Sequence, residues 1–389
     1  MSVSVNNPVA VEDIANTDLE WCFKPLMTLL NFAGMHMPMK RRKAFNALSI
    51  GYSVCFYVCL CLGNTRFFLF TRGTDTVGKW TTRLSYCGFQ VTCAYFTFAT
   101  CFSINRHLPK LFKEFDSFRK SYGSATDNAK IRRIVKILLG LLLCHSCIIQ
   151  AFIYMTTFNN INPKAIHLSP LGSIQEDYHL IFKIVYNVWL WLYILQMTAI
   201  LTFFVIFTYC LSKEYSRTNF QIKHVFDKAG KDAPSTREID RIRRQFEDIC
   251  SLVETADEVF KHVIGSCYIA SVPVICLMLY GLIHNDLMIE ENIMLIESLV
   301  VVMTIVVVLT LTSVALNFKA HSSLTCLLKV DLSRLPHKDL QIITVFITRI
   351  TTTNIGYTLY NLFTVDSSTI LMVRTVVVDV SLKCGVHGL

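Results

Sequence analysis

Charged residues are scarce in this sequence. They make up 17% of its 389 residues, whereas 53% are hydrophobic, and the mean hydropathy is +0.46. Soluble domains carry about 25% charged residues, so this shortage excludes an ordinary set of soluble domains. The apolar residues are gathered in runs long enough to cross a bilayer, which requires roughly 20 residues. The composition therefore indicates a membrane protein.

The motifs of enzymes, metal sites and cleavable leaders are also missing. The sequence has no Walker loop, no HExxH and no GxSxG. Among its 15 cysteines no CxxC pair has a second pair at zinc-site spacing, and most lie in apolar runs, where cysteine acts as a small hydrophobe. The N-terminus is polar and acidic, unlike a signal peptide. We therefore predict no enzyme, no cofactor and no metal, and an insertion signal in the run from Phe45.

Long apolar runs predict an all-α polytopic protein with seven spans and a cytoplasmic helical layer. No internal repeat stands out, which weakens a transporter built from inverted repeats. The seventh span carries three charged residues, Asp366, Arg374 and Asp379. The spans are predicted at roughly 44–63, 84–103, 134–157, 180–211, 259–284, 294–317 and 355–379.

The loops predict the orientation through their content of Lys and Arg. The segments 1–43, 104–133, 212–258 and 318–354 hold 27 of these residues, and the segments on the opposite side hold six. Cytoplasmic loops carry the excess, so the N-terminus is predicted inside. Basic cytoplasmic loops of a membrane protein also explain the net charge of +9 better than nucleic-acid binding does. A G-protein-coupled receptor is disfavoured, because its N-terminus is outside and the chain has neither DRY nor NPxxY, nor any N-x-[ST] sequon.

A charged loop before the fifth span has the pattern of a helix. Ser235 and Glu238 have the spacing of a capping box, which predicts a helix start. Apolar residues then recur at alternating steps of three and four, a coiled-coil-type seam that runs into the span as one long helix. The segment 338–354 is predicted to lie against this seam, forming a cytoplasmic layer that suits an assembly of subunits. The seam residues are Ile239, Ile242, Phe246, Ile249, Val253, Ala256 and Phe260, and the opposing ones are Leu340, Ile343, Val345, Phe346 and Ile350.

These patterns divide the chain into four parts. A cytoplasmic N-terminal segment covers 1–43, and a six-helix membrane bundle with the cytoplasmic extensions of 212–258 covers 44–317. A cytoplasmic helix is predicted within 318–354. The last, pore-type helix and an atypical tail take up 355–389.

The stretch "NIGYTLYNLFTVDSSTILMV", Asn354–Val373, resembles the insect gustatory receptor family. The family has a Gly-x-Phe-like stretch, an acidic residue and a Ser/Thr-rich helix start there. They correspond to Gly356, Phe363, Asp366, Ser367, Ser368 and Thr369. The family usually ends with Thr-Tyr-hydrophobic-Gln-Phe, whereas this chain continues after Arg374-Thr375 as "VVVDVSLKCGVHGL", without Tyr, Gln or Phe.

The resemblance implies a tastant-gated, non-selective cation channel in the plasma membrane of a sensory neuron. It implies a homo- or heterotetramer of receptor subunits, with the pore lined by the last helix and the small-molecule tastant bound in the outer half of each bundle. The unusual tail leaves a second possibility open, a non-conducting or regulatory subunit with a truncated last helix.

A pocket for a small polar molecule needs aromatic walls and a few converging hydrogen-bonding groups. Two of the candidate residues, Gln150 and Glu297, have an alternative role in hydrogen bonding between helices. The alternative role of the aromatic residues, Trp191 and Tyr193 included, is in the belt of aromatic side chains at the membrane interface. The outer halves of the predicted spans offer His145, Gln150, Tyr154, Tyr186, Asn187, Trp189, Tyr280, His284 and Glu297.

Charged and apolar residues of the last segment predict a pore. Arg374 facing lipid would cost roughly 2.5–3.5 kcal/mol, which a pore or interface position relieves. Asp366 is predicted to cap the span, and Asp379 to attract cations near the outer surface. The cluster Val376, Val377 and Val378 is predicted to form a constriction that gates by dewetting. The competing hypothesis is that the tail from about Arg374 is foreign to the family.

Overall fold

The computed structural model describes residues 19–37, 47–58, 77–158, 176–228, 235–284, 289–328, 336–353, 355–360, 362–369, 371 and 375. Over these residues the chain is helical apart from turns and one isolated bridge, which confirms the all-α prediction. The helices are α1 (Leu19–Phe32), α3 (Val77–Tyr122), α4 (Asn128–Phe158), α5 (Glu176–Lys228), α6 (Thr236–His284), α7 (Ile289–Leu327) and α8 (His337–Thr352), with a shorter apolar helix at Ala47–Val58.

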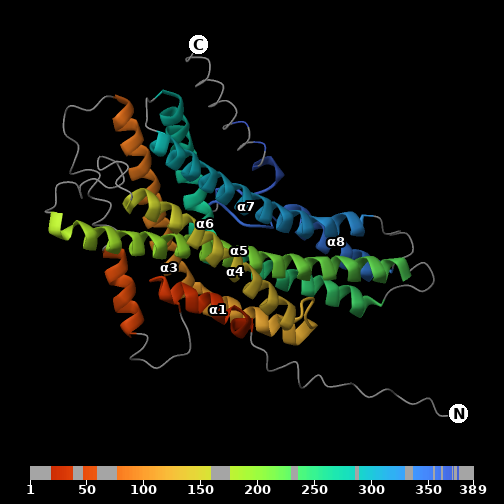
Figure 1. The fold of residues 1–389 in the computed structure, drawn as a ribbon. Coiled ribbons are helices and arrows are strands. Elements are labelled where there is room, and N and C mark those ends of the chain that lie inside the picture. The colour runs from red at the N-terminus through yellow and green to blue at the C-terminus, as the bar shows by residue number, and fades with distance from the viewer. Residues whose placement is uncertain are drawn as a thin grey trace.

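The long helices pack side by side into one bundle (Figure 1). α3 packs mainly on α6, while α5 contacts α4, α6 and α7, and α1 lies on α4 and α5. In the described part of the chain, four helices are long and apolar enough to cross a membrane: Asn128–Ala151, Asn187–Phe226, Thr236–Ile283 and Leu295–Leu327. The predicted spans 84–103, 134–157, 180–211, 259–284 and 294–317 each lie within a helix, and helix Ala47–Val58 lies within 44–63.

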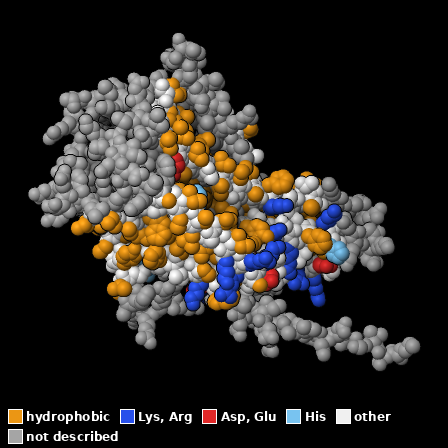
Figure 2. All heavy atoms as spheres, viewed as in Figure 1, with side chains coloured by type: hydrophobic (Ala, Val, Ile, Leu, Met, Phe, Trp, Pro, Cys, Tyr) orange, Lys and Arg blue, Asp and Glu red, His pale blue; other side chains and the backbone are white. Residues whose placement is uncertain are grey.

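Several helices continue well beyond their apolar runs. α5 has 53 residues and α6 has 49, so each is longer than a span requires. Figure 2 shows Lys and Arg gathered across the lower centre and right of the described surface, and apolar side chains mainly above them and to the left. Exposed apolar residues such as Leu141, Val188 and Val300 belong to α4, α5 and α7. This separation is expected of a bundle that has one end outside the lipid.

The predicted long helix of the fifth span is confirmed. α6 begins at Thr236, where the Ser235 carbonyl accepts hydrogen bonds from the backbone N–H groups of Glu238 (2.8 Å) and Ile239 (3.2 Å). All seven seam residues of α6 are buried, between 0% and 6% exposed. A strict alternation of three and four keeps one face inward along the helix, so the periodicity in the sequence was sufficient to predict it.

α8 packs on this seam through a narrower face than predicted. Ile343, Phe346 and Ile350 are buried, whereas Val345 is 56% exposed. One residue corresponds to about 100° of rotation around a helix, so Val345 points away when Phe346 points inward. The Phe346 and Phe246 rings lie 5.1 Å apart in an edge-to-face arrangement, which joins α8 to α6.

The start of the predicted seventh span is wrong. Residues 355–366 form a turn, in which the Leu359 N–H donates to the Phe363 carbonyl (2.9 Å) and the Val365 N–H donates to the Tyr357 carbonyl (2.8 Å). Backbone φ angles of +152° at Gly356 and +48° at Tyr360 are incompatible with a right-handed helix. Apolar content had suggested a span here, but Ile355, Tyr357, Leu359 and Val365 are buried in the protein.

The helix after this turn begins at Ser367, with Asp366 as its cap. The Asp366 carboxylate accepts hydrogen bonds from the backbone N–H groups of Ser368 (2.9 Å) and Thr369 (3.3 Å), and Thr369 Oγ1 accepts one from the Asp366 N–H (3.2 Å). Hydrogen bonds from Ser368 hold the pKa of the Asp366 carboxyl below its ordinary value. The predicted capping role of Asp366 is therefore confirmed.

Candidate functional site

Two predicted pocket residues meet where α4 faces α5. Gln150 Nε2 donates to the Asn187 carbonyl (3.1 Å) and to Asn187 Oδ1 (3.3 Å), and Asn187 is only 4% exposed. This contact is the hydrogen bonding between helices that was the alternative role for Gln150. The other end of the amide, Gln150 Oε1, is buried without a hydrogen-bond partner among the described residues. Gln150 thus fixes the helix pair and keeps one acceptor free.

Beyond this contact, α5 carries two stacked aromatic side chains, Trp189 and Tyr193, which we call the aromatic wall. Trp189 and Tyr193 are one helical turn apart, and their rings are stacked with centroids 6.2 Å apart and planes 12° apart. Phe56 of the Ala47–Val58 helix packs against Tyr193. An interfacial belt would leave Tyr193 partly in water, but it is 6% exposed and its hydroxyl has no partner in the described part of the chain. Tyr193 therefore belongs to the interior.

Three further buried polar residues, on α3, α4 and α5, were not among the predicted pocket residues. Gln196 on α5, Ser146 on α4 and Thr100 on α3 are each 0% exposed, and their side-chain polar atoms lack partners among the described residues. An unpaired buried polar group costs about 1–3 kcal/mol, and native structures contain few. Gln196 could have been found by the argument applied to Gln150, since it also lies in an apolar run; serine and threonine are too common in spans.

Three other predicted pocket residues, His145, Tyr280 and Glu297, do not join this group in the structure. His145 is exposed on α4 and Tyr280 is 36% exposed on α6. Glu297 is half-buried on α7, where the neighbouring Leu295 packs with Val274 of α6. The side chains of Tyr154, Tyr186 and His284, and all of Arg374, Val376, Val377, Val378 and Asp379, lie outside the described residues.

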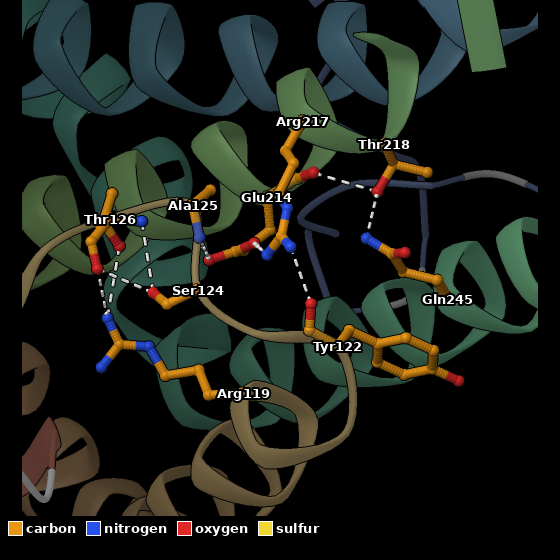
Figure 3. Close-up of polar contacts among 9 residues, drawn as sticks. All are labelled: Arg119, Tyr122, Ser124, Ala125, Thr126, Glu214, Arg217, Thr218 and Gln245. Atoms are coloured by element: carbon orange, nitrogen blue, oxygen red, sulfur yellow. Dashed lines mark hydrogen bonds and ion pairs between the residues drawn. The ribbon is translucent and has the colours of Figure 1, made fainter. Parts of the chain in front are cut away.

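A second buried polar group holds the turn between α3 and α4 at the basic end of the bundle (Figure 3). Glu214 of α5 is 0% exposed, and its Oε1 accepts a hydrogen bond from the Ala125 N–H (2.9 Å). Its Oε2 lies 4.0 Å from Arg217 Nη1, and Arg217 Nη2 donates to the Tyr122 carbonyl (2.7 Å). Gly123 permits this approach, because its φ is +77° and a Cβ there would lie 3.2 Å from Arg217 Nη2.

Further hydrogen bonds close the turn and connect this buried polar group to α6. Arg119 Nη2 donates to the Thr126 carbonyl (2.9 Å), which closes the turn. Thr218 Oγ1 donates to the Glu214 carbonyl (3.1 Å) and accepts from Gln245 Nε2 of α6 (3.1 Å). The group joins α3, α5 and α6 by hydrogen bonds, and we interpret it as structural. Among the described residues, no three His, Cys, Asp or Glu side chains gather as metal ligands would.

The turn at 355–366 is docked on the bundle by polar contacts from three helices. The hydroxyls of Tyr357, which is fully buried, and Thr208 of α5 are 2.8 Å apart. Asp257 of α6 accepts hydrogen bonds from the Thr358 N–H (2.8 Å) and Oγ1 (2.5 Å). Asn317 Nδ2 of α7 donates to the carbonyl of residue 355 (2.8 Å). The segment that leads into the last helix is therefore attached to α5, which carries the aromatic wall, and to the neighbouring helices α6 and α7.

The bundle of apolar helices has the fold of a solved membrane protein. The insect olfactory receptor OR5 from Machilis hrabei has a TM-score of 0.70 to this chain at 12% identity, covering 94% of this chain and 97% of the receptor. The same receptor in complex with eugenol has a TM-score of 0.69, with the same identity and coverage. Comparison with curated proteins finds no match.

A family model described as 7tm Chemosensory receptor matches residues 38–378. The chain belongs to this family of insect chemosensory receptors, whose members are ligand-gated cation channels and not enzymes.

Proposed function

We propose that this chain is a gustatory receptor subunit that forms a tastant-gated, non-selective cation channel in the plasma membrane of a sensory neuron. The observation that carries the proposal is the set of unpaired, buried polar atoms beside the stacked Trp189 and Tyr193 rings. The segment from Gly356 to Thr369, with its capping Asp366, supports the gustatory branch. The similar olfactory receptor was solved with eugenol, a small molecule.

The ligand that fits this chemistry is a small molecule with an apolar body and a few hydroxyl or carbonyl groups. Its body would lie on the aromatic wall, as apolar pocket linings require. Gln150 Oε1 would accept a hydrogen bond, while the Tyr193 hydroxyl and the Gln196 amide would donate or accept. Each such bond contributes roughly 0.5–1.5 kcal/mol to binding, because it replaces bonds to water.

The pore would be formed by the last helix of several subunits, in a homo- or heterotetramer. If the helix that begins at Ser367 continues, Val376 lies about 13 Å and Asp379 about 18 Å along its axis, at 1.5 Å per residue. That depth places the valine cluster near the middle of a hydrocarbon core of about 30 Å, where a hydrophobic constriction controls wetting. Asp379 would then lie on the outer side of the valine cluster and, facing the pore, attract cations.

The proposal is tested by Gln196→Leu, recorded in cells that express the chain and are exposed to a panel of small hydroxylated compounds. Leucine removes unpaired polar atoms, so the purified variant should be as stable as the natural chain or more so. The ligand concentration for half-maximal current should nevertheless rise about two- to tenfold. His145→Leu, an exposed change on α4, is the matched control and should alter neither quantity.

Two outcomes would contradict the proposal. An unchanged ligand response in Gln196→Leu at equal surface expression would show that the ligand does not bind in this region. A natural chain that is silent, but conducts once the ending Thr-Tyr-hydrophobic-Gln-Phe replaces its tail after Thr375, would favour the alternative of a regulatory subunit. The departure of the tail from that ending is the observation that keeps this alternative in place.

A further inference from the structure

Tyr360 has a backbone conformation that large residues rarely adopt. Its φ is +48°, in the left-handed region where an L side chain crowds its own backbone. Among the described residues it is the only non-glycine with a positive φ. Such a conformation persists only where the surroundings enforce it, and it clusters at sites that move or bind. The contacts of the Tyr360 side chain show what enforces it here.

The Tyr360 ring lies directly on the backbone of α6 at Gly265. A Cβ built on Gly265 would lie 2.0 Å from Tyr360 Cε2 and 2.5 Å from Cζ, closer than any real Cβ contact. Glycine is costly inside a helix, by about as much as one hydrogen bond. Its presence in the middle of α6 therefore fits a requirement for this flat approach, which we call the Gly265 slot.

The Tyr360 hydroxyl reaches two helices at once. It lies 3.3 Å from His262 Nδ1 of α6 and 3.3 Å from the Tyr95 hydroxyl of α3. The His262 ring also packs edge-on against the Tyr360 ring, with centroids 5.6 Å apart. Tyr360 is partly exposed and Tyr95 is 51% exposed, so this contact is separate from the apolar core. It depends on how α3 sits relative to α6.

The turn transmits the position of Tyr360 to the last helix. Thr358 and Thr364 are paired in an antiparallel bridge, and Tyr360 lies inside the loop that this bridge closes. Asp366, the cap of the last helix, follows two residues after Thr364. Hydrogen bonds hold the residues on both sides of Tyr360, so a shift of Tyr360 would also move the start of the last helix.

From this geometry we propose that Tyr360 is a positioning residue for gating. Seated in the Gly265 slot and bonded to His262 and Tyr95, it holds the last helix in its resting position and releases it when α3 and α6 move relative to each other. The part that concerns gating rests on the proposed channel function. The seat itself is a statement about this chain alone and is tested separately.

The seat is tested by hydrogen exchange of the purified full chain, followed in peptides from 355–369. Gly265→Ala places a methyl group where the ring lies, so exchange in these peptides should be at least about fivefold faster than in the natural chain, as expected for losing one or two hydrogen bonds. Gly140→Ala is the matched control, because a Cβ at Gly140 in α4 meets nothing within 4 Å. It should leave these peptides unchanged.

Tyr360→Phe provides a milder variant in case the alanine variant does not fold. It keeps the ring in the slot and removes only the hydroxyl, so exchange should rise by less than in Gly265→Ala. In the double variant Gly265→Ala with Tyr360→Gly, the effects should not add, because both changes act through the same ring. Unchanged exchange in both Gly265→Ala and Tyr360→Phe would overturn the proposed seat.

Currents test the gating part. At equal surface expression, Gly265→Ala and Tyr360→Phe should raise ligand-independent current severalfold, while Gly140→Ala should not. Faster exchange combined with natural resting current would overturn the role in gating and leave a purely structural seat. If no version of the chain conducts although exchange responds as expected, the channel function fails and the seat stands.

Discussion

Replacing Phe246 with alanine should strongly destabilise the chain. Phe246 is 0% exposed and lies at the centre of the seam. Its ring packs against Tyr215 of α5 at 5.6 Å and against Phe346 of α8 at 5.1 Å, both edge-to-face. One side chain therefore joins three helices at the basic end of the bundle.

The magnitude follows from burial and from these two ring contacts. Truncating a buried phenylalanine to alanine costs about 3–5 kcal/mol, which includes the cavity left behind. The two aromatic pairs account for about 0.5–1.5 kcal/mol each. The matched control is Phe220→Ala on α5, where the ring is 69% exposed, and this change should cost within about 0.5 kcal/mol.

The assay is denaturant unfolding of the purified full chain in detergent, with far-ultraviolet circular dichroism as the readout. Combining Phe246→Ala with Phe346→Ala should give less than the sum of the single costs, because the second change removes a contact already lost. Equal costs for Phe246→Ala and Phe220→Ala would refute the packing argument. Strict additivity of the pair would refute the contact between α6 and α8.

Two further predictions concern orientation and the pore. An epitope tag placed before Trp21 should stain only permeabilised cells, because 27 of the loop Lys and Arg residues lie on the side of the N-terminus; staining of intact cells would overturn this topology. Val377→Ser should ease wetting of the proposed constriction and raise ligand-independent current, whereas an unchanged resting current at equal surface expression would exclude Val377 from the gate.

The parts of the fold that follow a helical period could be predicted from the sequence. The seam of α6 is correct at every position, because burial on one face leaves a repeat that can be counted. The turn at 355–366 could not be predicted in this way. Its Tyr357 and Val365 are as apolar as residues of a span, and they are buried in protein instead of lipid. The positive φ of Tyr360 could not be predicted either, because an aromatic residue in a sequence does not indicate a left-handed backbone conformation.

The candidate site was predictable in kind but not in its partners. The alternative role given to Gln150, hydrogen bonding between helices, is the one that the structure shows. The sequence did not show that Gln150 and Asn187 contact each other, since that depends on how α4 and α5 are rotated. The buried residues Leu142 and Ser146 of α4 are four residues apart, one on each turn. His145 precedes Ser146 by one residue, about 100° around the helix, and is therefore exposed.

α5 connects the proposed ligand region to the turn before the last helix. Its inner face carries Tyr193, Gln196, Phe204 and Thr208 at helical spacing, each between 0% and 6% exposed. Tyr193 and Thr208 are about 22 Å apart along the helix, at 1.5 Å per residue. Tyr357 then contacts both Phe204, with ring centroids 5.0 Å apart, and Thr208. A ligand that shifts or rotates α5 at Tyr193 would therefore act directly on the turn. Because packed interiors respond by discrete rearrangement, the turn is the element in this chain that could convert ligand binding into movement of the last helix.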